Sequence, residues 1–172
     1  MALAWAQGDD RMLQAIPRNL SRLTDFSGRD GRAQFWPYAI LVFVLAFIGV
    51  AVAMNLAMMG LLMGTADMPN IPLMIGGVGG VVLIAAALLS AAVTRRLHDT
   101  GRPGYWGLPP IVFLLIGLAL FPILMNSVLN NPNPPIALFL GLFLNNMLYI
   151  ASLIGLVVLL LLDGTKTANR YG

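Results

Sequence analysis

Residues 95–106 read RRLHDTGRPGYW, and they form a short polar stretch in a chain that is otherwise mostly apolar. The stretch holds three of the ten basic residues and the single histidine. Around it the charges are far apart, because residues 33–66, 68–94 and 103–162 contain no Asp, Glu, Lys or Arg. A helix crosses the hydrocarbon of a bilayer with about 20 apolar residues. The first two uncharged runs therefore each accommodate one membrane crossing, and the third accommodates two.

The composition excludes an ordinary soluble domain. The 172 residues are 59% hydrophobic and 10% charged, whereas a soluble domain carries roughly 25% charged residues. The chain has no glutamate and a single lysine, which is too little charge to cover a soluble surface. The sequence NNPNPP at 130–135 supplies a turn within the longest uncharged run, because proline interrupts a helix. We therefore predict an all-α membrane protein, a bundle of four transmembrane helices at about 36–63, 72–97, 106–129 and 136–162.

A short amphipathic interfacial helix is predicted ahead of the first transmembrane helix, within residues 11–26. Its apolar residues recur at helical spacing, and its arginines share another face. Such a helix either lies on the inner leaflet, with its arginines toward acidic headgroups, or packs against its own bundle. The predicted organisation is an N-terminal cytoplasmic segment over 1–28, a four-helix domain over 29–163 and a cytoplasmic tail over 164–172. The apolar and basic positions of the short helix are Leu13, Ile16, Leu20, Leu23, Arg11, Arg18 and Arg22.

The distribution of basic residues predicts the orientation in the membrane, because Lys and Arg are enriched in cytoplasmic loops. All ten lie before the first predicted transmembrane helix, between the second and the third, or after the fourth. The other two loops have Asp67 as their only charge. An even number of crossings places both termini on one side. We therefore expect a multi-pass protein with residues 95–106 and both termini in the cytoplasm.

Two features within the predicted helices indicate how they pack. The second helix begins with IGGVGG, so that Gly76 and Gly80 lie four residues apart on one face. Small residues at this spacing let helix backbones approach closely. Asn145 and Asn146 lie within the fourth helix, where we expect hydrogen bonds to a neighbouring helix, each contributing about 0.6–2 kcal/mol. A substrate site at the two asparagines is the alternative.

Residues 95–106 fit either a structural connection or an active site. In the structural interpretation, Arg95 and Arg96 end the second helix, and Arg95 pairs with Asp99 four residues further on. In the catalytic interpretation, His98 and Asp99 serve a membrane hydrolase. A zinc site needs three or four ligands, and the chain has one histidine, no cysteine and no glutamate. The structural interpretation is favoured, and no catalytic residue, metal site or cofactor is predicted.

Three motifs occur at predicted helix ends: FSGRDGRAQFW at 26–36, RRLHDTGRPGYW at 95–106 and GTKTANRYG at 164–172. Together they resemble a bacterial inner-membrane family catalogued as domain of unknown function 805. The resemblance covers nearly the whole chain, from about Phe26 to Gly172. It implies a multi-helix protein of the bacterial inner membrane with a cluster of polar residues on the cytoplasmic side, and it implies no reaction.

The chain departs from the family pattern at two of the three motifs. The family usually has a serine and an acidic residue where this chain has Gly31 and Gln34, so we expect a weaker cap at the start of the first transmembrane helix. The family commonly has a glycine in the place of Ala168.

The three motifs lie in separate cytoplasmic segments, and we expect them to meet in one hydrogen-bonded cluster. The predicted function is that of an accessory, assembly or scaffolding subunit that packs against other membrane proteins or a second copy. An anionic-lipid-binding protein and a small-solute transporter are the alternatives. The expected partners are membrane lipids and membrane proteins, and no nucleic acid. The cluster residues, which serve structure or bind lipid or a partner, are Arg29, Arg32, Arg95, Arg96, His98, Asp99, Arg102, Asn169 and Arg170.

Overall fold

The computed structural model describes residues 14–67, 69–167 and 169–171. Throughout these residues the regular structure is helical, which confirms the predicted all-α fold class. Four of the helices are long and apolar enough to cross a membrane. In chain order the elements are α2 (Ala15–Leu20), α3 (Arg32–Leu62), α4 (Ile71–Asp99), a 3-10 helix (Gly104–Gly107), α5 (Leu108–Asn130) and α6 (Ile136–Leu161).

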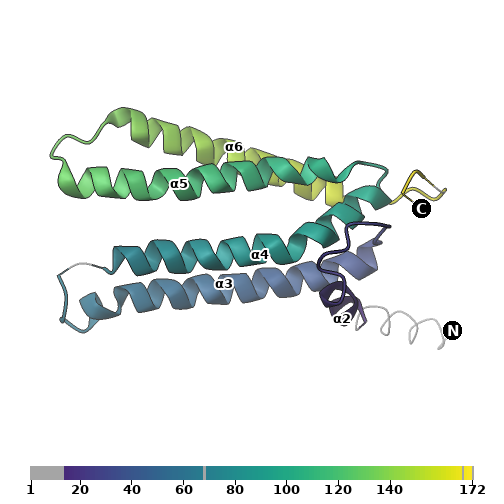
Figure 1. The fold of residues 1–172 in the computed structure, drawn as a ribbon, viewed down its shortest axis with the longest axis horizontal. Coiled ribbons are helices and arrows are strands. Elements are labelled where there is room, and N and C mark those ends of the chain that lie inside the picture. The colour runs from purple at the N-terminus through teal and green to yellow at the C-terminus, as the bar shows by residue number, and fades with distance from the viewer. Residues whose placement is uncertain (1–13, 68, 168, 172) are drawn as a thin grey trace.

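The four long helices form two antiparallel hairpins, α3 with α4 and α5 with α6, which lie alongside one another (Figure 1). Helix–helix contacts are concentrated within each hairpin, and α4 is the helix that also contacts α5 and α6. The connection from α4 to α5 and the short helix α2 lie together at one end (Figure 1). We call this the polar end; α3 and α5 begin there, at Arg32 and Leu108, and α4 and α6 end there, at Asp99 and Leu161.

Local sequence sets the ends of the helices. Helix α3 begins before the predicted residue 36, because Gly31 is extended and its N–H donates to the Gln34 side chain at 3.3 Å. We expected a weaker cap at the start of this helix, because Gln34 stands where the family usually has an acidic residue. The glutamine nevertheless makes one of the capping hydrogen bonds. Helix α4 ends at Asp99, and two residues later Gly101 has a φ of +76°, a conformation that favours glycine. The N–H groups of Gly101 and Arg102 bond back to the carbonyls of residues 98 and 97, so that the chain leaves α4 through a glycine C-cap.

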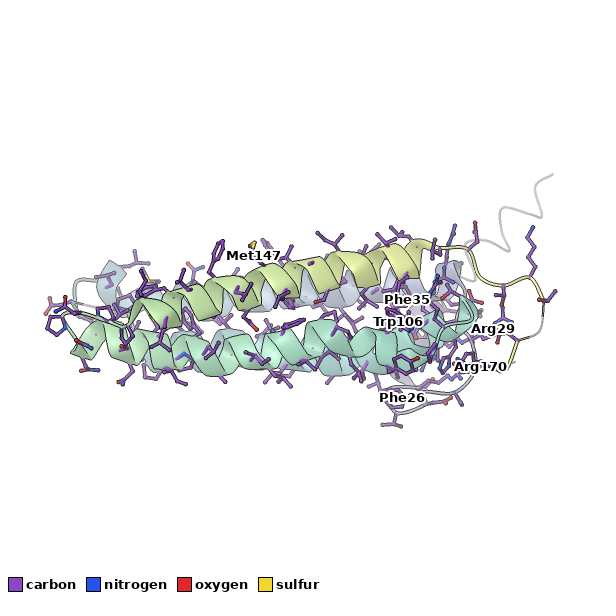
Figure 2. All side chains as sticks on the ribbon, turned by 90° about the horizontal axis from the view of Figure 1, so that it is seen from above. Phe26, Arg29, Phe35, Trp106, Met147 and Arg170 are labelled. Atoms are coloured by element: carbon purple, nitrogen blue, oxygen red, sulfur yellow. The ribbon has the colours of Figure 1, made fainter. Side chains whose placement is uncertain are left out.

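The buried core lies toward the polar end and joins the two hairpins. Eight buried residues from three helices form it: Phe35, Tyr38, Ala39 and Val42 of α3, Ala92 and Leu97 of α4, and Leu156 and Leu160 of α6. The Tyr38 hydroxyl donates to the Leu88 carbonyl at 2.9 Å and adds a polar link between α3 and α4. In Figure 2 the labelled residues Phe35, Trp106 and Arg29 lie at this end.

Away from the polar end most apolar side chains are exposed. In the most apolar part of each long helix, between 6% and 17% of the residues are buried. Phe47 of α3, for example, is 78% exposed, and Phe143 of α6 is 63% exposed. Exposure of apolar faces of this extent to water is energetically unfavourable for a monomer. The surface therefore requires an apolar solvent, which a bilayer supplies.

The glycines of α4 that pack within the chain are not the predicted pair, Gly76 and Gly80. A Cβ added to Gly76 or Gly80 would meet nothing within 4 Å, so these two glycines bring no helices of the chain together. Their neighbours do, since a Cβ at Gly77 would lie 3.0 Å from Ala53 of α3, and one at Gly79 would lie 3.2 Å from Leu118 of α5. Gly77 and Gly79 point about 160° apart on α4, toward α3 and α5 respectively, and the predicted Gly76–Gly80 face lies between these two directions.

Helix α2 packs against its own chain. Ala15 and Asn19 are buried, and the Asn19 side chain donates to the carbonyl of Gln34 in α3 at 2.9 Å. Leu20, on the predicted apolar face, is 50% exposed and does not pack into the bundle. Arg11 and Leu13 of the predicted amphipathic pattern lie outside the described residues, as does Ala168.

Replacing Gly77 with leucine should separate α3 from α4, because Ala53 leaves no room for a larger side chain. We expect Gly77→Leu to lower the free energy of unfolding by about 1–3 kcal/mol. The matched variant Gly76→Leu places the same side chain in open space one residue away and should leave stability unchanged. Thermal unfolding of the purified protein in mild detergent, followed by circular dichroism, measures both. Equal losses in the two variants would contradict the observed packing face.

Candidate functional site

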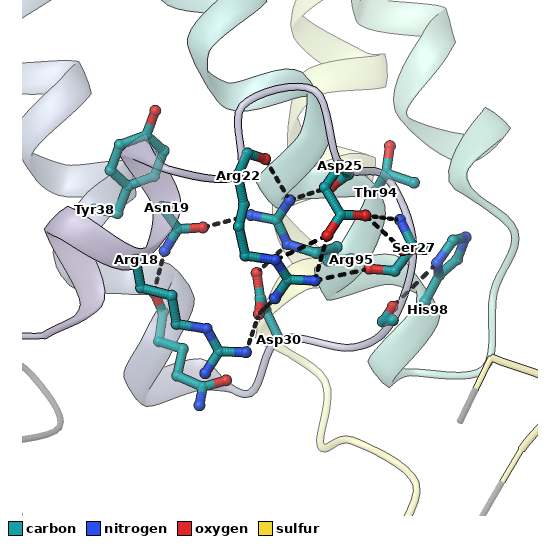
Figure 3. A network of polar contacts seen from close by, with 12 residues as sticks. Arg18, Asn19, Arg22, Asp25, Ser27, Asp30, Tyr38, Thr94, Arg95 and His98 are labelled. Atoms are coloured by element: carbon teal, nitrogen blue, oxygen red, sulfur yellow. Dashed lines mark hydrogen bonds and ion pairs between the residues drawn. The ribbon is translucent and has the colours of Figure 1, made fainter.

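The side chain of Arg95 lies at the centre of a polar network between the end of α4 and the chain that precedes α3 (Figure 3). Arg95 is 1% exposed, and its Nε donates to the Asp30 carboxylate at 2.5 Å. One terminal nitrogen donates to Asn19 Oδ1 at 2.7 Å, and the other donates to the backbone carbonyls of Arg22 and Asp25. All three nitrogens of the guanidinium are thus used within the chain.

Asp30, the counterion of Arg95, is itself 1% exposed. Its second oxygen accepts from Arg18 at 3.2 Å, and its N–H donates to the Arg95 carbonyl at 3.2 Å. Backbone and side chain of Asp30 therefore both bind Arg95. A buried ion pair holds only when further hydrogen bonds satisfy the remaining polar atoms, and these contacts supply them.

Arg96, the next residue, is fully buried and points to the other hairpin. Its Nε donates to the Leu160 carbonyl at 3.0 Å and one terminal nitrogen donates to the Leu162 carbonyl at 2.6 Å. The last carbonyls of a helix have no partner within the helix and carry its negative end. Arg96 therefore caps α6 from the end of α4, and its remaining nitrogen donates to Asp99.

The tail after α6 folds back over the end of α4. Arg29 pairs with Asp99 at 3.2 Å and donates to the Thr165 carbonyl at 2.5 Å. The Thr165 N–H donates to the Asp99 carbonyl at 2.9 Å. Asn169 donates to the carbonyl of His98 at 3.1 Å. The segment before α3, the end of α4 and the tail thus meet at Asp99.

The His98 ring closes this contact by stacking on Tyr171, with ring centroids 3.8 Å apart and planes within 5°. Its Nδ1 lies 3.3 Å from the Gly28 carbonyl. A carbonyl only accepts, so this contact requires the proton on Nδ1. Of the neighbouring hydroxyls, Thr94 donates to the Ser90 carbonyl and Thr100 to the Leu97 carbonyl. Neither hydroxyl bonds to the imidazole, as a nucleophile with its base would.

We call the contacts around Arg95, Arg96 and Asp99 the arginine network. In the part of the chain that the structure describes, every buried side-chain N or O atom has a hydrogen-bond partner. At its rim, the Ser27 hydroxyl and N–H together with Arg22 hold the pKa of Asp25 well below its usual range. Among the described residues, no three His, Cys, Asp or Glu side chains gather as they would around a metal ion. The buried arginines of the network are paired with the carboxylates of Asp30 and Asp99 of the same chain.

The structure brings together most of the residues predicted for the cluster. Arg32 lies at the margin, paired with Asp163 at 2.6 Å through side chains that are both exposed. Arg170 lies over the Tyr171 ring at 4.8 Å. Arg102 has no ion pair within the described part of the chain. The members of the predicted set that hydrogen-bond within the arginine network are Arg29, Arg95, Arg96, His98, Asp99 and Asn169.

The predicted pair of Arg95 with Asp99 is wrong. Asp99 pairs with Arg96 and Arg29, while Arg95 pairs with Asp30. Asp30 and Asn19 are the residues that sequence reasoning missed. One signal could have indicated Asp30, because adjacent arginines on a helix point about 100° apart and one aspartate cannot neutralise both. The second counterion then had to come from another segment.

The two asparagines of α6 behave differently. Asn145 is buried and donates to the Phe113 carbonyl of α5 at 3.0 Å, which ties the two helices of the second hairpin together. Asn146 is exposed. Its side chain makes no hydrogen bond to any residue that the structure describes.

Removing the charge of Asp30 should unfold the polar end, because Arg95 would remain buried without a counterion. We expect Asp30→Asn to lower the free energy of unfolding by about 3–5 kcal/mol. Asp25→Asn, five residues earlier, removes a carboxylate whose side chain is 40% exposed and should have a much smaller effect. Chemical denaturation in detergent micelles distinguishes the two. A small loss in Asp30→Asn would show that the Arg95–Asp30 pair does not hold the polar end.

Comparison with known proteins gives a family and no function. No curated protein and no solved structure matches the chain. A family model described as "Protein of unknown function (DUF805)" matches residues 23–172, which include Asp30, both buried arginines and the tail. Because the match covers nearly the whole chain, the protein belongs to this family of unknown function, DUF805.

Proposed function

We propose that the protein is a non-catalytic, multi-pass subunit of the bacterial inner membrane that assists other membrane proteins by packing against them. One contrast carries the proposal. The buried polar groups at the polar end are used within the chain, whereas the intramembrane faces remain largely exposed. What the protein offers to the outside is therefore helix surface rather than reactive side chains.

The network supports a structural role for the polar end. An active site keeps its charged groups available to a substrate, and here the two most buried arginines donate to carboxylates and carbonyls of their own chain. The same contacts join both hairpins, so that a rigid end holds the two pairs of helices in a fixed relation. A scaffold needs helices that are held in a fixed arrangement.

Helix α4 offers the contact surface that best fits a partner helix. Gly76 and Gly80 lie four residues apart with open space at both Cβ positions. In lipid, helices associate where small residues allow close backbone approach. A stripe of glycines that is unused within the chain is thus available to a helix of another protein.

The orientation in the membrane follows from charge. Asp67 is the only charged residue in the loops opposite the polar end, and the basic residues that the structure describes lie at the polar end. Positively charged segments stay in the cytoplasm. We infer that the polar end and both termini are cytoplasmic.

Anionic lipid binding is a second candidate, and it rests on a separate observation. Arg102, Lys166 and Arg170 form no ion pair with described residues, and Tyr105 and Trp106 beside Arg102 are 64% and 50% exposed. Basic residues at a membrane surface each contribute about 1 kcal/mol toward acidic headgroups, and Tyr and Trp favour the same level. Lipid bound there would hold the polar end at the bilayer surface.

The test is extraction of the full-length protein from its native membrane in a mild detergent, followed by native mass spectrometry. We expect a partner protein in fixed stoichiometry. The double variant Gly76→Leu/Gly80→Leu should lose it, because leucine fills the stripe.

Gly141→Leu/Gly155→Leu is the matched control. These glycines of α6 also have nothing within 4 Å of an added Cβ, and the control should retain the partner. Protein that carries only anionic lipid, lost on Arg102→Ala, would support the second candidate and overturn the first.

A further inference from the structure

Asn146 places an amide where a bilayer offers it no partner. Helix α6 has 26 residues and spans about 39 Å at 1.5 Å per residue, against a hydrocarbon thickness of about 30 Å. Asn146 lies ten residues after the start of α6 at Ile136, or about 15 Å along it. If α6 is centred in the membrane, the amide lies about 10 Å inside the hydrocarbon.

Within the described residues, the Asn146 side chain makes none of the hydrogen bonds that other asparagines of the chain make. Asn55 donates to the Ala51 carbonyl one turn earlier at 2.8 Å, and Asn130 donates to Asn126 in the same manner. Asn145 reaches α5. Asn146 makes none of these bonds within the described residues, and its short side chain cannot extend to the interface, as lysine or arginine can.

An unpaired amide in hydrocarbon is strongly unfavourable, and a donor or acceptor on another molecule would therefore stabilise the exposed Asn146 side chain. Lipid tails carry no donor or acceptor. The residues on the same face of α6, three before and four after Asn146, are Phe143 and Ile150, which are 63% and 47% exposed. The amide is therefore surrounded by apolar side chains that a second helix could cover.

A second copy of the chain carries the same carboxamide, Asn146, which can serve as the hydrogen-bond partner. Copies inserted with the same orientation place α6 at the same depth, so a two-fold axis along the membrane normal brings identical residues together. A carboxamide has both donors and an acceptor and is complementary to itself. We propose that two copies associate in parallel through α6, with the Asn146 side chains hydrogen-bonded to each other across the axis.

This dimer uses a different surface from the one proposed for partner proteins. The partner site lies on α4 around Gly76 and Gly80, whereas the dimer contact lies on α6 around Asn146. Loss of the partner contact on α4 does not require loss of the dimer contact on α6. The two proposals are therefore tested with different variants, and the partner complex and the dimer are detected separately.

The chain has no cysteine, and a single introduced cysteine is therefore a unique reporter. In native membrane vesicles, Phe143→Cys and Ile150→Cys should cross-link to a product of twice the chain mass on oxidation. Leu144→Cys and Leu148→Cys lie on another face of α6, with exposed fractions of 59% and 43%, and should cross-link weakly. Equal cross-linking from both faces would overturn the proposal, as would cross-linking of Phe143→Cys to a different protein.

The amide is tested in the Phe143→Cys background. Asn146→Leu should lower the yield of cross-linked dimer by about threefold to thirtyfold, the effect expected of a hydrogen bond between membrane helices. Asn146→Gln should retain most of it. Asn145→Leu should lower thermal stability and leave the dimer, because Asn145 bonds within its own hairpin. An unchanged dimer in Asn146→Leu, in a protein with wild-type thermal stability, would refute the role of the amide.

Discussion

Two adjacent buried arginines at the end of α4 hold the structure together. Consecutive residues on a helix point in different directions, and Arg95 and Arg96 accordingly reach different parts of the chain. Arg95 binds the segment before α3 through Asp30, and Arg96 binds the end of α6 through two carbonyls. The helix that carries both arginines packs against α3 in its own hairpin and also contacts α5 and α6 of the other hairpin.

The rest of the architecture depends on this arrangement because a bilayer supplies little force of its own between helices. In lipid the apolar faces of the hairpins gain little by leaving the tails, so association relies on close packing and hydrogen bonds. The core that joins the hairpins lies at the polar end, next to the arginines. Buried ion pairs add little net stability, but an unpaired buried charge is costly, and this makes the pairing selective. The network thus specifies which ends meet.

The sequence predicts the helices well, and it predicts their contacts less well. Charge spacing alone locates four long apolar helices, because the bilayer imposes a length that few other structures need. The loops and the helix ends follow from glycine, proline and asparagine. The motifs at the helix ends also predict that the segment before α3, the end of α4 and the tail come together, as they do around Asp99.

The sequence does not predict which of two adjacent residues makes a contact in the fold. Gly76 and Gly77 are identical residues about 100° apart on one helix, and only the position of α3 decides that Gly77 is packed. The same holds for Asn145 and Asn146, and for the partner of each arginine. Asp99 is close to Arg95 in sequence, yet Asp30 is the residue that the fold brings to it, 65 positions away.

The positions of the partners along the chain also set an order of events during synthesis. Every group that Arg95 binds precedes it, so the first hairpin can close around Arg95 once α4 has left the ribosome. The carbonyls that Arg96 caps lie 64 and 66 residues later. Until α6 is inserted, Arg96 keeps nitrogens exposed that are buried in the finished protein. A chain that stops after α5 therefore leaves the Arg96 guanidinium with Asp99 as the one partner that its side chain retains among those of the finished protein.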